Sequence, residues 1–333
     1  MSDKRTLSLM REFMETPSAT ALDLVRNFSG EQLDAALKEC ALSTDLVSEA
    51  VENWNAFRRD DSWVSLLASM LEIVGRQRGD ANAPIPIWSD LEGSGPNGRL
   101  FYFYAFALCA KDTRDFHRRA GVPGAIIDAT LGVLADHVAI HQRKYETVGV
   151  DAGWWMLPVL RGELLQIGSL QYHRVTLGVG TLSPFPWYEE NEIEARGIGF
   201  RLGDPSVGIH IPDRADLSEE GVDASLDEAR RVLGTLWPAQ GRRLATCQTW
   251  MLDDRLGALL SSTSNIVQFQ QRFTLLPQWH EEDGDVLEFV FRRVDTTLEK
   301  LPQTTSLERA VVGVLQSGSH WRNRTGWLDF DGV

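Results

Sequence analysis

The chain has 333 residues, of which 43% are hydrophobic and 24% charged, and its formal net charge at pH 7 is −14. This composition is that of a globular protein rather than a disordered one. The acidic balance argues against a nucleic-acid partner, which a basic face would bind. The length suits about two domains. Three cysteines, odd in number and far apart, predict neither a disulfide framework nor a structural zinc site.

The N-terminal residues lack the uninterrupted apolar run of a signal peptide. The longest apolar run, Leu100–Ala110, is shorter than the roughly 18 residues that a membrane span needs. We therefore expect a cytoplasmic protein without a membrane span, in which this run is part of a buried helix.

Residues 1–148 carry helical patterns. Ser29 and Ser43 each precede apolar residues at helical spacing, as N-cap residues do. The segment Gly79–Gly98 holds three prolines and four glycines, which predicts a long surface loop. The first 148 residues are expected to form an all-helical domain, with helices at 29–37, 43–51, 63–74, 100–116 and 123–145.

From residue 149 onward the pattern changes to short aliphatic segments bounded by Gly, Pro or Asp, which is typical of strands. The predicted strands are 164–175, 193–202, 207–211, 244–252, 272–276 and 286–294, with helices at 218–237 and 253–260. The order is strand, strand, strand, helix, strand, helix, strand, strand. The sequence thus predicts an α+β protein in which the helical domain packs on a mixed-sheet domain, residues 149–333.

This order and five local motifs resemble one acyltransferase family. The motifs are Val207-Gly-Ile-His-Ile-Pro212, Cys247-Gln-Thr-Trp-Met-Leu-Asp253, Ser264-Asn-Ile-Val-Gln-Phe-Gln-Gln-Arg-Phe273, Leu301-Pro-Gln-Thr-Thr-Ser-Leu-Glu-Arg-Ala310 and Gly318-Ser-His-Trp321. Together they look like a bacterial family with an N-terminal helical N-acyltransferase domain and a GNAT-like C-terminal domain. Its members include the N-acyltransferases that attach long acyl chains to glycopeptide antibiotics. The resemblance implies an acyl-CoA donor and a small amine-bearing acceptor.

Two departures from the wider GNAT fold stand out. That fold has one more strand ahead of its first helices, which the sequence does not reveal. It also binds the CoA pyrophosphate with a Gln/Arg-x-x-Gly-x-Gly/Ala loop, and residues 212–221 lack that signature. Where the family has Gly-Arg-Leu-Gln-Phe, this chain has Gly168-Ser-Leu-Gln-Tyr172, without the basic residue.

The resemblance implies that the fourth and fifth strands of the fold diverge around the pantetheine arm of acyl-CoA. It places the fourth strand at 207–211, with backbone groups of Val207, Gly208, Ile209 and Ile211 on the donor. The helix after it would direct its N-terminus at the pyrophosphate. Glu219 and Glu220 oppose an anion there, so Arg214, Arg242 or Arg243 is expected to compensate.

An attacking amine must lose a proton, so a general base is expected near the fourth strand. His210, two residues before Pro212, is the first candidate and His173 the second. The alternative for His210 is a structural histidine bonded to the neighbouring loop. Cys247 is either a proton donor to the leaving thiolate or a small buried apolar residue.

Several further residues have both a binding and a structural interpretation. Trp154 and Trp155 are candidates for gating an acyl channel and Trp250 for lining it, although tryptophans at such positions also serve as core. Asn265 either contacts the pantetheine or caps a turn. Arg272 and Arg309 are expected to be buried ion-pair partners rather than phosphate contacts, which are the alternative.

Other chemistries lack their motifs. His137 and His141 lie one helical turn apart, but the Glu of a His-Glu-x-x-His zinc site is missing, so no metal is expected. The competing hypothesis is a non-catalytic module that keeps the fold and binds CoA or a lipid as a sensor or scaffold. O-acyl transfer with the same residues is a third.

Overall fold

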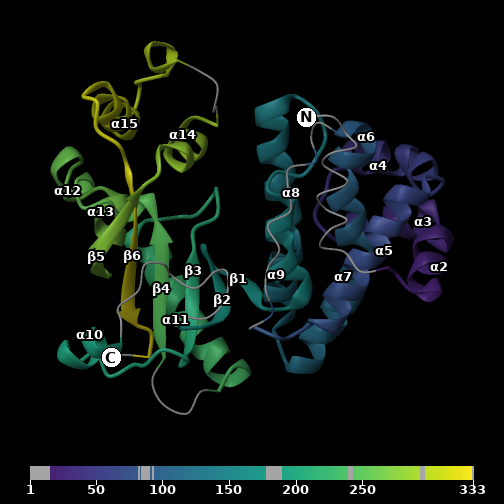
Figure 1. Ribbon diagram of the computed structural model, residues 1–333, viewed down its shortest axis with the longest axis horizontal. Helices are drawn as coiled ribbons and strands as arrows, with labels where there is room; N and C mark the ends of the chain where they lie inside the picture. Colours follow the sequence, from purple (N-terminus) through teal and green to yellow (C-terminus); the bar gives the residue numbers. More distant parts are fainter. Residues whose placement is uncertain are drawn as a thin grey trace. The chain divides into compact units, whose positions relative to one another are not determined.

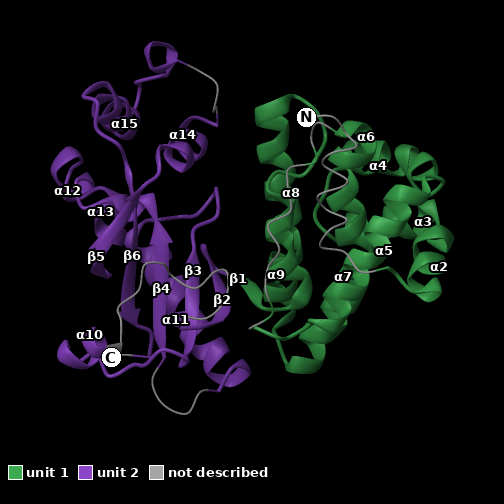
Figure 2. Cartoon of the chain, viewed as in Figure 1, with its two compact units in different colours: residues 1–166 green, residues 167–333 purple. Residues whose placement is uncertain are grey.

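A computed structural model describes residues 16–81, 83, 91, 94–177, 190–238, 243–292 and 297–331. The chain divides into two compact units, residues 1–166 and 167–333, coloured separately in Figure 2. The first unit is built from helices, and the second contains most of a mixed six-stranded sheet (Figure 1). The predicted α+β fold is confirmed.

The helices among the described residues of the first unit are α2 (Ala19–Asn27), α3 (Gly30–Lys38), α4 (Thr44–Phe57), α5 (Asp61–Arg76), α6 (Gly95–Arg99), α7 (Phe101–Ala120), α8 (Gly124–Tyr145), η2 (Gly153–Trp155) and α9 (Met156–Arg161). Ser29 caps α3 as predicted, and its exchange of hydrogen bonds with Gln32 completes a capping box. Helix α6 begins inside the predicted loop 79–98, half of which lies outside the described residues.

Helices α7 and α8 match the predicted helices 100–116 and 123–145. The apolar run at the start of α7 is buried, and so is the predicted stripe of α8, which comprises Ile127, Leu131, Leu134 and Val138. Helix α8 is long and apolar enough to cross a membrane by length and composition, but half of that window is buried inside the structure. The core helix of a soluble protein meets the same criterion.

The sheet has the strand order β1-β2-β3-β4-β6-β5. Strand β3 pairs parallel with β4, whereas the β2–β3, β4–β6 and β5–β6 pairs are antiparallel. Among the described residues no strand precedes β1. The strands are β1 (Leu164–Ile167), β2 (Leu170–Thr176), β3 (Pro205–His210), β4 (Leu244–Thr249), β5 (Thr274–Glu281) and β6 (Arg322–Asp329).

The helices of the second unit connect these strands. They are α10 (Glu190–Ala195), α11 (Glu219–Leu236), η3 (Trp250–Leu252), α12 (Leu256–Leu259), α13 (Asn265–Gln270), α14 (Asp283–Phe291), η4 (Leu298–Lys300) and α15 (Ser306–Gln316). Helices α14 and α15 lie toward one end of the sheet and α10 toward the other (Figure 1). The predicted helix 218–237 is confirmed as α11, capped by Ser218.

Two predicted strands before α11 are wrong in detail. The segment 164–175 is two strands, because Gly168 at φ +59° turns the chain between β1 and β2. The segment 193–202 is not a strand. It contains the end of α10, and then Gly197 and Gly199 at φ +63° and +76°, conformations that a strand does not adopt. The count of strands before α11 is right only because these two errors offset each other.

The last two elements of the sheet domain are also corrected. Residues 286–291 of the predicted strand 286–294 belong to helix α14, because Glu282 caps it and Asp283 and Asp285 occupy its first turn; residues 293 and 294 lie outside the described residues. Strand β6 was missed, since Arg322–Asp329 is too polar for a strand pattern, yet it lies between β4 and β5. The predicted strand 244–252 ends at Thr249, where η3 begins.

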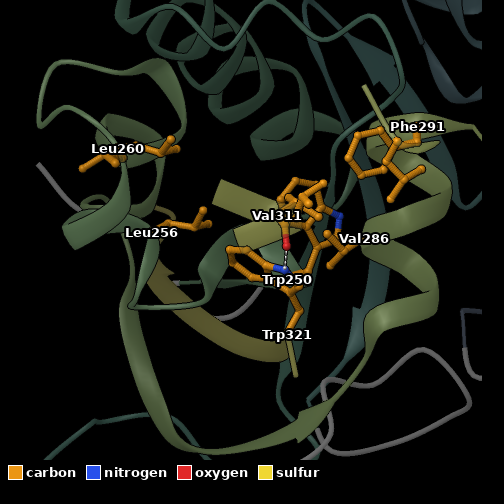
Figure 3. Packing of buried hydrophobic residues seen from close by; sticks show 10 residues of the cluster. Trp250, Leu256, Leu260, Val286, Phe291, Val311 and Trp321 are labelled. Carbon is orange, nitrogen blue, oxygen red and sulfur yellow. Dashed lines mark hydrogen bonds between the residues drawn. The ribbon is translucent and has the colours of Figure 1, made fainter. Parts of the chain in front are cut away.

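Helices α14 and α15 pack around a core that includes η3 (Figure 3). The Trp321 indole N–H donates to the Val311 carbonyl at 3.3 Å, which anchors α15 to the start of β6. Val286 and Phe291, whose β-type composition suggested a strand, fill this core from α14. The buried members are Trp250, Leu256, Leu260, Val267, Val286, Phe291, Leu301, Val311, Val312 and Trp321.

Candidate active site

Strands β3 and β4 stop pairing before either strand ends. They pair through Ser206–Leu244, Val207–Ala245 and Gly208–Thr246. Beyond these pairs β3 stays with β2 as far as His210, and β4 stays with β6 as far as Thr249. All of these residues are described, so the facing edges of β3 from residue 209 and of β4 from residue 247 form an opening that no strand pairing closes. We call it the β3–β4 opening; an extended ligand can enter it as an added strand.

The two faces of the sheet at this opening differ in chemistry. Because residues alternate along a strand and directly paired residues share a face, the register sorts the side chains. One face, called here the histidine face, carries His173, Gly208, His210, Thr246, Gln248, Asn323, Thr325 and Trp327. The other, called here the α11 face, carries Tyr172, Val207, Ile209, Ala245 and Cys247, and the Tyr172 hydroxyl lies 2.9 Å from Ser225 Oγ of α11.

His210 and His173 lie beside each other on the histidine face. Their ring centroids are 5.7 Å apart, and a Cβ placed on Gly208 would lie 3.3 Å from His210 Nε2 and 3.5 Å from His173 Cβ. Glycine at position 208 therefore gives the His210 ring its space. His173 is 2% exposed, while His210 is partly exposed at the end of β3. Burial, followed by the neighbouring His173, lowers the pKa of His210 to about 3, which leaves the ring neutral at pH 7.

Cys247 lies on the opening edge of β4 but on the α11 face, away from both imidazoles. It is 2% exposed, and burial raises the pKa of its thiol to about 12. Val207 and Ile209 are each 1% exposed on the same face. Ile211, the first residue after β3, is partly buried.

The N-terminus of α11 follows β3 through residues 211–218. The Asp216 carboxylate accepts from the Ser218 backbone N–H at 3.0 Å, and this bond lowers the pKa of Asp216. A Cβ on Gly221 would lie 2.7 Å from that carboxylate, so glycine allows this close approach. The chain thus places one of its own carboxylates beside this helix end, in addition to the exposed Glu219 and Glu220.

The three arginines expected to offset these acids differ in placement. Arg214 is exposed in the loop before α11. Arg243 does not serve, because its guanidinium is bound by Asp331 at 2.5 Å and stacks over Phe330. Arg242 lies outside the described residues. Of the predicted ion-pair partners, Arg272 binds Asp223, whereas Arg309 is exposed and donates to the carbonyls of Gln303 and Thr304.

Trp250 is a core residue, and Asn265 is not the cap of its helix. Trp250 is 3% exposed in the core cluster of Figure 3. Ser264 rather than Asn265 caps α13, because the Ser264 hydroxyl accepts from Val267 N at 3.4 Å. Asn265 is the exposed first residue of that helix. The capping role predicted for Asn265 is therefore wrong.

Trp154 and Trp155 belong to the first unit, where they form the 3-10 helix η2. Their rings meet edge to face, with centroids 5.6 Å apart and planes at 85°. A Cβ on Gly153 would lie 2.0 Å from the Tyr102 ring, so only glycine fits directly before the pair. Both indoles are partly buried.

The structure adds two polar residues that the sequence analysis missed. Asn323 and Thr325 lie on β6, on the histidine face, and are 8% and 0% exposed. Because Arg322–Asp329 lacks a strand pattern, no local signal points to these two residues. Elsewhere, His137 and His141 each face a backbone carbonyl, that of Asp151 at 2.7 Å and of Thr147 at 3.0 Å.

Comparison with known proteins identifies both halves of the chain. The N-acyltransferase N-terminal domain matches residues 31–162, and the GNAT-like C-terminal domain matches residues 164–328. No curated protein sequence matches the chain.

Several solved structures are similar to nearly the whole chain. An acyltransferase in complex with decanoyl-CoA and teicoplanin is 30% identical with a TM-score of 0.79, over 97% of this chain and 94% of that chain. An acyltransferase in complex with CoA and 10C-teicoplanin is 31% identical with a TM-score of 0.75, over 88% and 86%. A mutant acyltransferase in complex with octanoyl-CoA is 30% identical with a TM-score of 0.78, over 95% and 90%.

Proposed function

Because this chain belongs to the acyltransferase family that joins an N-acyltransferase N-terminal domain to a GNAT-like C-terminal domain, we propose that it acylates an amino group of a glycopeptide similar to teicoplanin. The chain is an acyl-CoA N-acyltransferase, with acyl-CoA as the donor. The observation that carries the proposal is the β3–β4 opening, where the backbone edges of two parallel strands are left to a ligand.

The opening suits the pantetheine arm of acyl-CoA. Its amide groups would pair with the backbone of Ile209, His210 and Ile211 as another strand does. A backbone N–H at this edge would then donate to the thioester oxygen as negative charge develops on it. Gly208, the last residue paired with β4, lies directly before the opening.

The sheet separates donor from acceptor. Helix α11 covers the face that carries Ile209 and Cys247, and its N-terminal loop follows β3 directly. A CoA pyrophosphate near that loop brings the donor in from the α11 face, and Arg214 is the described arginine that the loop offers to it. The acceptor amine then approaches from the histidine face.

His210 is the group best placed to receive the proton. The amine nitrogen bonds to the thioester carbon, the carbonyl oxygen becomes an oxyanion, and the C–S bond breaks when the oxyanion collapses. The added proton on nitrogen passes to the His210 imidazole, and the CoA thiolate later takes it up. The ring is neutral at pH 7 and can therefore accept a proton, and its low pKa makes it a weak base that passes the proton on to the thiolate readily. His173, on β2 and almost fully buried, would act through His210.

Cys247 is better suited to packing beside the donor than to acting as a general acid. A thiol whose pKa is raised to about 12 does not readily protonate a thiolate, since an ordinary thiol has a pKa near ~8.5. Its burial among apolar residues of the α11 face fits packing beside the donor. For the acyl chain, Trp154 and Trp155 remain the proposed gate, and the core position of Trp250 argues for a structural role.

The test is thiol release by the purified protein from octanoyl-CoA and decanoyl-CoA, with deacylated teicoplanin as acceptor. Mass spectrometry of the product should show one acyl chain on an amine. If acyl-CoA binds and raises the melting temperature but this acceptor releases no thiol above background, the glycopeptide assignment is wrong; if diverse other amines also release none, the chain is a CoA-binding sensor or scaffold instead. An ester product would point to O-acyl transfer.

A further inference from the structure

Strand β6 brings buried polar side chains to a position where a central strand normally carries apolar ones. It lies between β4 and β5, and on the histidine face it presents Asn323 and Thr325 in succession. Thr325 is 0% exposed and Asn323 8%. A central strand gains stability from apolar side chains, so this pair calls for a reason other than stability.

Both side chains keep a buried polar atom without a partner. Within the described part of the chain, Thr325 Oγ1 and Asn323 Oδ1 have no hydrogen-bond partner. The other end of the Asn323 amide is used, because its Nδ2 donates to Asp285 Oδ2 of α14 at 3.4 Å. A buried polar atom left unbonded destabilises a fold by about 1–3 kcal/mol. In a native fold such an atom calls for an explanation, and a bound ligand or water that supplies the missing bond is one.

The register places these atoms across the opening from His210. Gly208 pairs with Thr246, so two residues further on His210 stands level with Gln248, and Gln248 pairs with Thr325. All three share the histidine face. Thr325 therefore lies on the strand next to β4, and His210 lies on the far side of the opening from both. A group that reacts in the opening has His210 on one side and β6 on the other.

The same face offers room for a bulky molecule. Two residues beyond Thr325, the Trp327 indole borders a cavity of about 570 Å³. Its lining combines an aromatic ring, a cation and a carboxylate, and comprises Arg196, Gly197, Ile198, Phe200, Thr274, Trp327 and Asp329. The buried Trp327 Nε1 also has no hydrogen-bond partner among the described residues. A mixed polar and aromatic lining suits a polar aromatic molecule better than an alkyl chain.

We propose that Thr325 and Asn323 are acceptor-binding residues, which hydrogen-bond the hydroxyl groups beside the attacking amine and hold it toward His210. The Thr325 hydroxyl donates or accepts, and Asn323 Oδ1 accepts from an O–H or N–H. The remainder of the acceptor extends along the same face toward the Trp327 cavity. This assignment rests on the proposed function.

The test is Thr325→Val, which keeps the side-chain shape and removes the hydroxyl. With decanoyl-CoA and deacylated teicoplanin, the KM for the glycopeptide should rise about 3- to 10-fold, while the KM for decanoyl-CoA stays unchanged. The melting temperature should stay the same or rise, because the variant loses an unsatisfied buried polar atom. Asn323→Leu should affect the glycopeptide KM in the same direction.

The matched control is Ser206→Ala, which removes a buried hydroxyl that already donates to the Leu244 carbonyl at 2.8 Å. It should lower the melting temperature and leave the glycopeptide KM unchanged. If wild type turns over and Thr325→Val has an unchanged glycopeptide KM, the acceptor assignment is wrong and the proposed function stands. A folded wild type that releases no thiol overturns both.

Discussion

On the α11 face of the sheet, the side chains around the β3–β4 opening are apolar and at most 2% exposed: Val207, Ile209, Ala245 and Cys247. The histidine face is nearly as buried, but its side chains are polar: His173, Thr246, Asn323 and Thr325 are at most 8% exposed. Burying apolar surface stabilises by about 25 cal/mol per Å², whereas burying polar atoms costs free energy unless each is bonded. The comparison shows one sheet with stability concentrated on one face and reactive groups on the other.

The largest effect is expected on the histidine face. His210→Ala should lower kcat by about 10²- to 10⁴-fold, the contribution usual for a general base, and leave the affinity for acyl-CoA nearly intact. Steady-state kinetics and direct acyl-CoA titration measure the two quantities separately. If His210→Ala keeps the wild-type kcat, His210 is not the base. If His173→Ala shows the loss of kcat and His210→Ala does not, His173 is the base.

A substitution on the α11 face should change the stability of the fold rather than the rate of acyl transfer. A Cβ at Gly326, which is paired with Cys247, would lie 2.8 Å from Phe273 Cβ and 3.0 Å from Leu252 Cδ1. Gly326→Ala should therefore destabilise the fold by about 1–3 kcal/mol, seen as a lower urea midpoint. Gly313→Ala on α15 is the control, since its Cβ meets nothing within 4 Å, and it should stabilise by about 0.5–1 kcal/mol. Equal midpoints for the two variants would contradict the packing of this face.

Low pH should reduce the free energy of unfolding, because His210 on the histidine face is held neutral in the folded state. Burial lowers the pKa of His210 to about 3 from the usual 6.5, so between these values the unfolded chain binds more protons than the folded one. Stability then falls as pH decreases through that window, by at most about 1.4 kcal/mol per pH unit from this group. In His210→Gln the loss of unfolding free energy between pH 7 and pH 5 should be smaller by up to ~2 kcal/mol. An identical pH dependence in both proteins would place His210 in a more solvated site.

The smallest effect is expected for Cys247. Cys247→Ala should keep kcat within about 2-fold, because burial keeps the thiol neutral with a pKa near 12. For the same reason the folded protein should resist a thiol-reactive reagent at this residue at pH 8. A tenfold loss of kcat in Cys247→Ala would instead make the thiol part of the proton path.

The sequence predicted what local chemistry determines. Helices α3 and α11 were found because Ser29 and Ser218 cap them before apolar residues at helical spacing. His210 was found because it ends an aliphatic strand before Pro212. The site depends further on register, which fixes where β3 leaves β4 and which side chains share a face. No local pattern encodes register between strands that are separated by α11.

The mispredicted segments share one property: the residue composition of each favours one secondary structure, and its tertiary contacts determine another. Val286–Phe291 is rich in residues typical of strands, but the acids before it and the core around Trp321 make it helical. Strand β6 shows the reverse, since Asn323 and Thr325 are atypical of a central strand and their place is set by pairing with β4 and β5. The residues that local rules predict least well are those assigned here to the acceptor.

The central place of β6 also affects how the protein is made. Ribosomes synthesise a chain from its N-terminus, so β4 and β5 emerge before the strand that joins them. Until Arg322–Asp329 has been made, the edges of β4 and β5 that will pair with it stay open, and open strand edges are sites of misassociation between nascent chains. The sheet therefore cannot close between β4 and β5 until Arg322–Asp329 has left the ribosome.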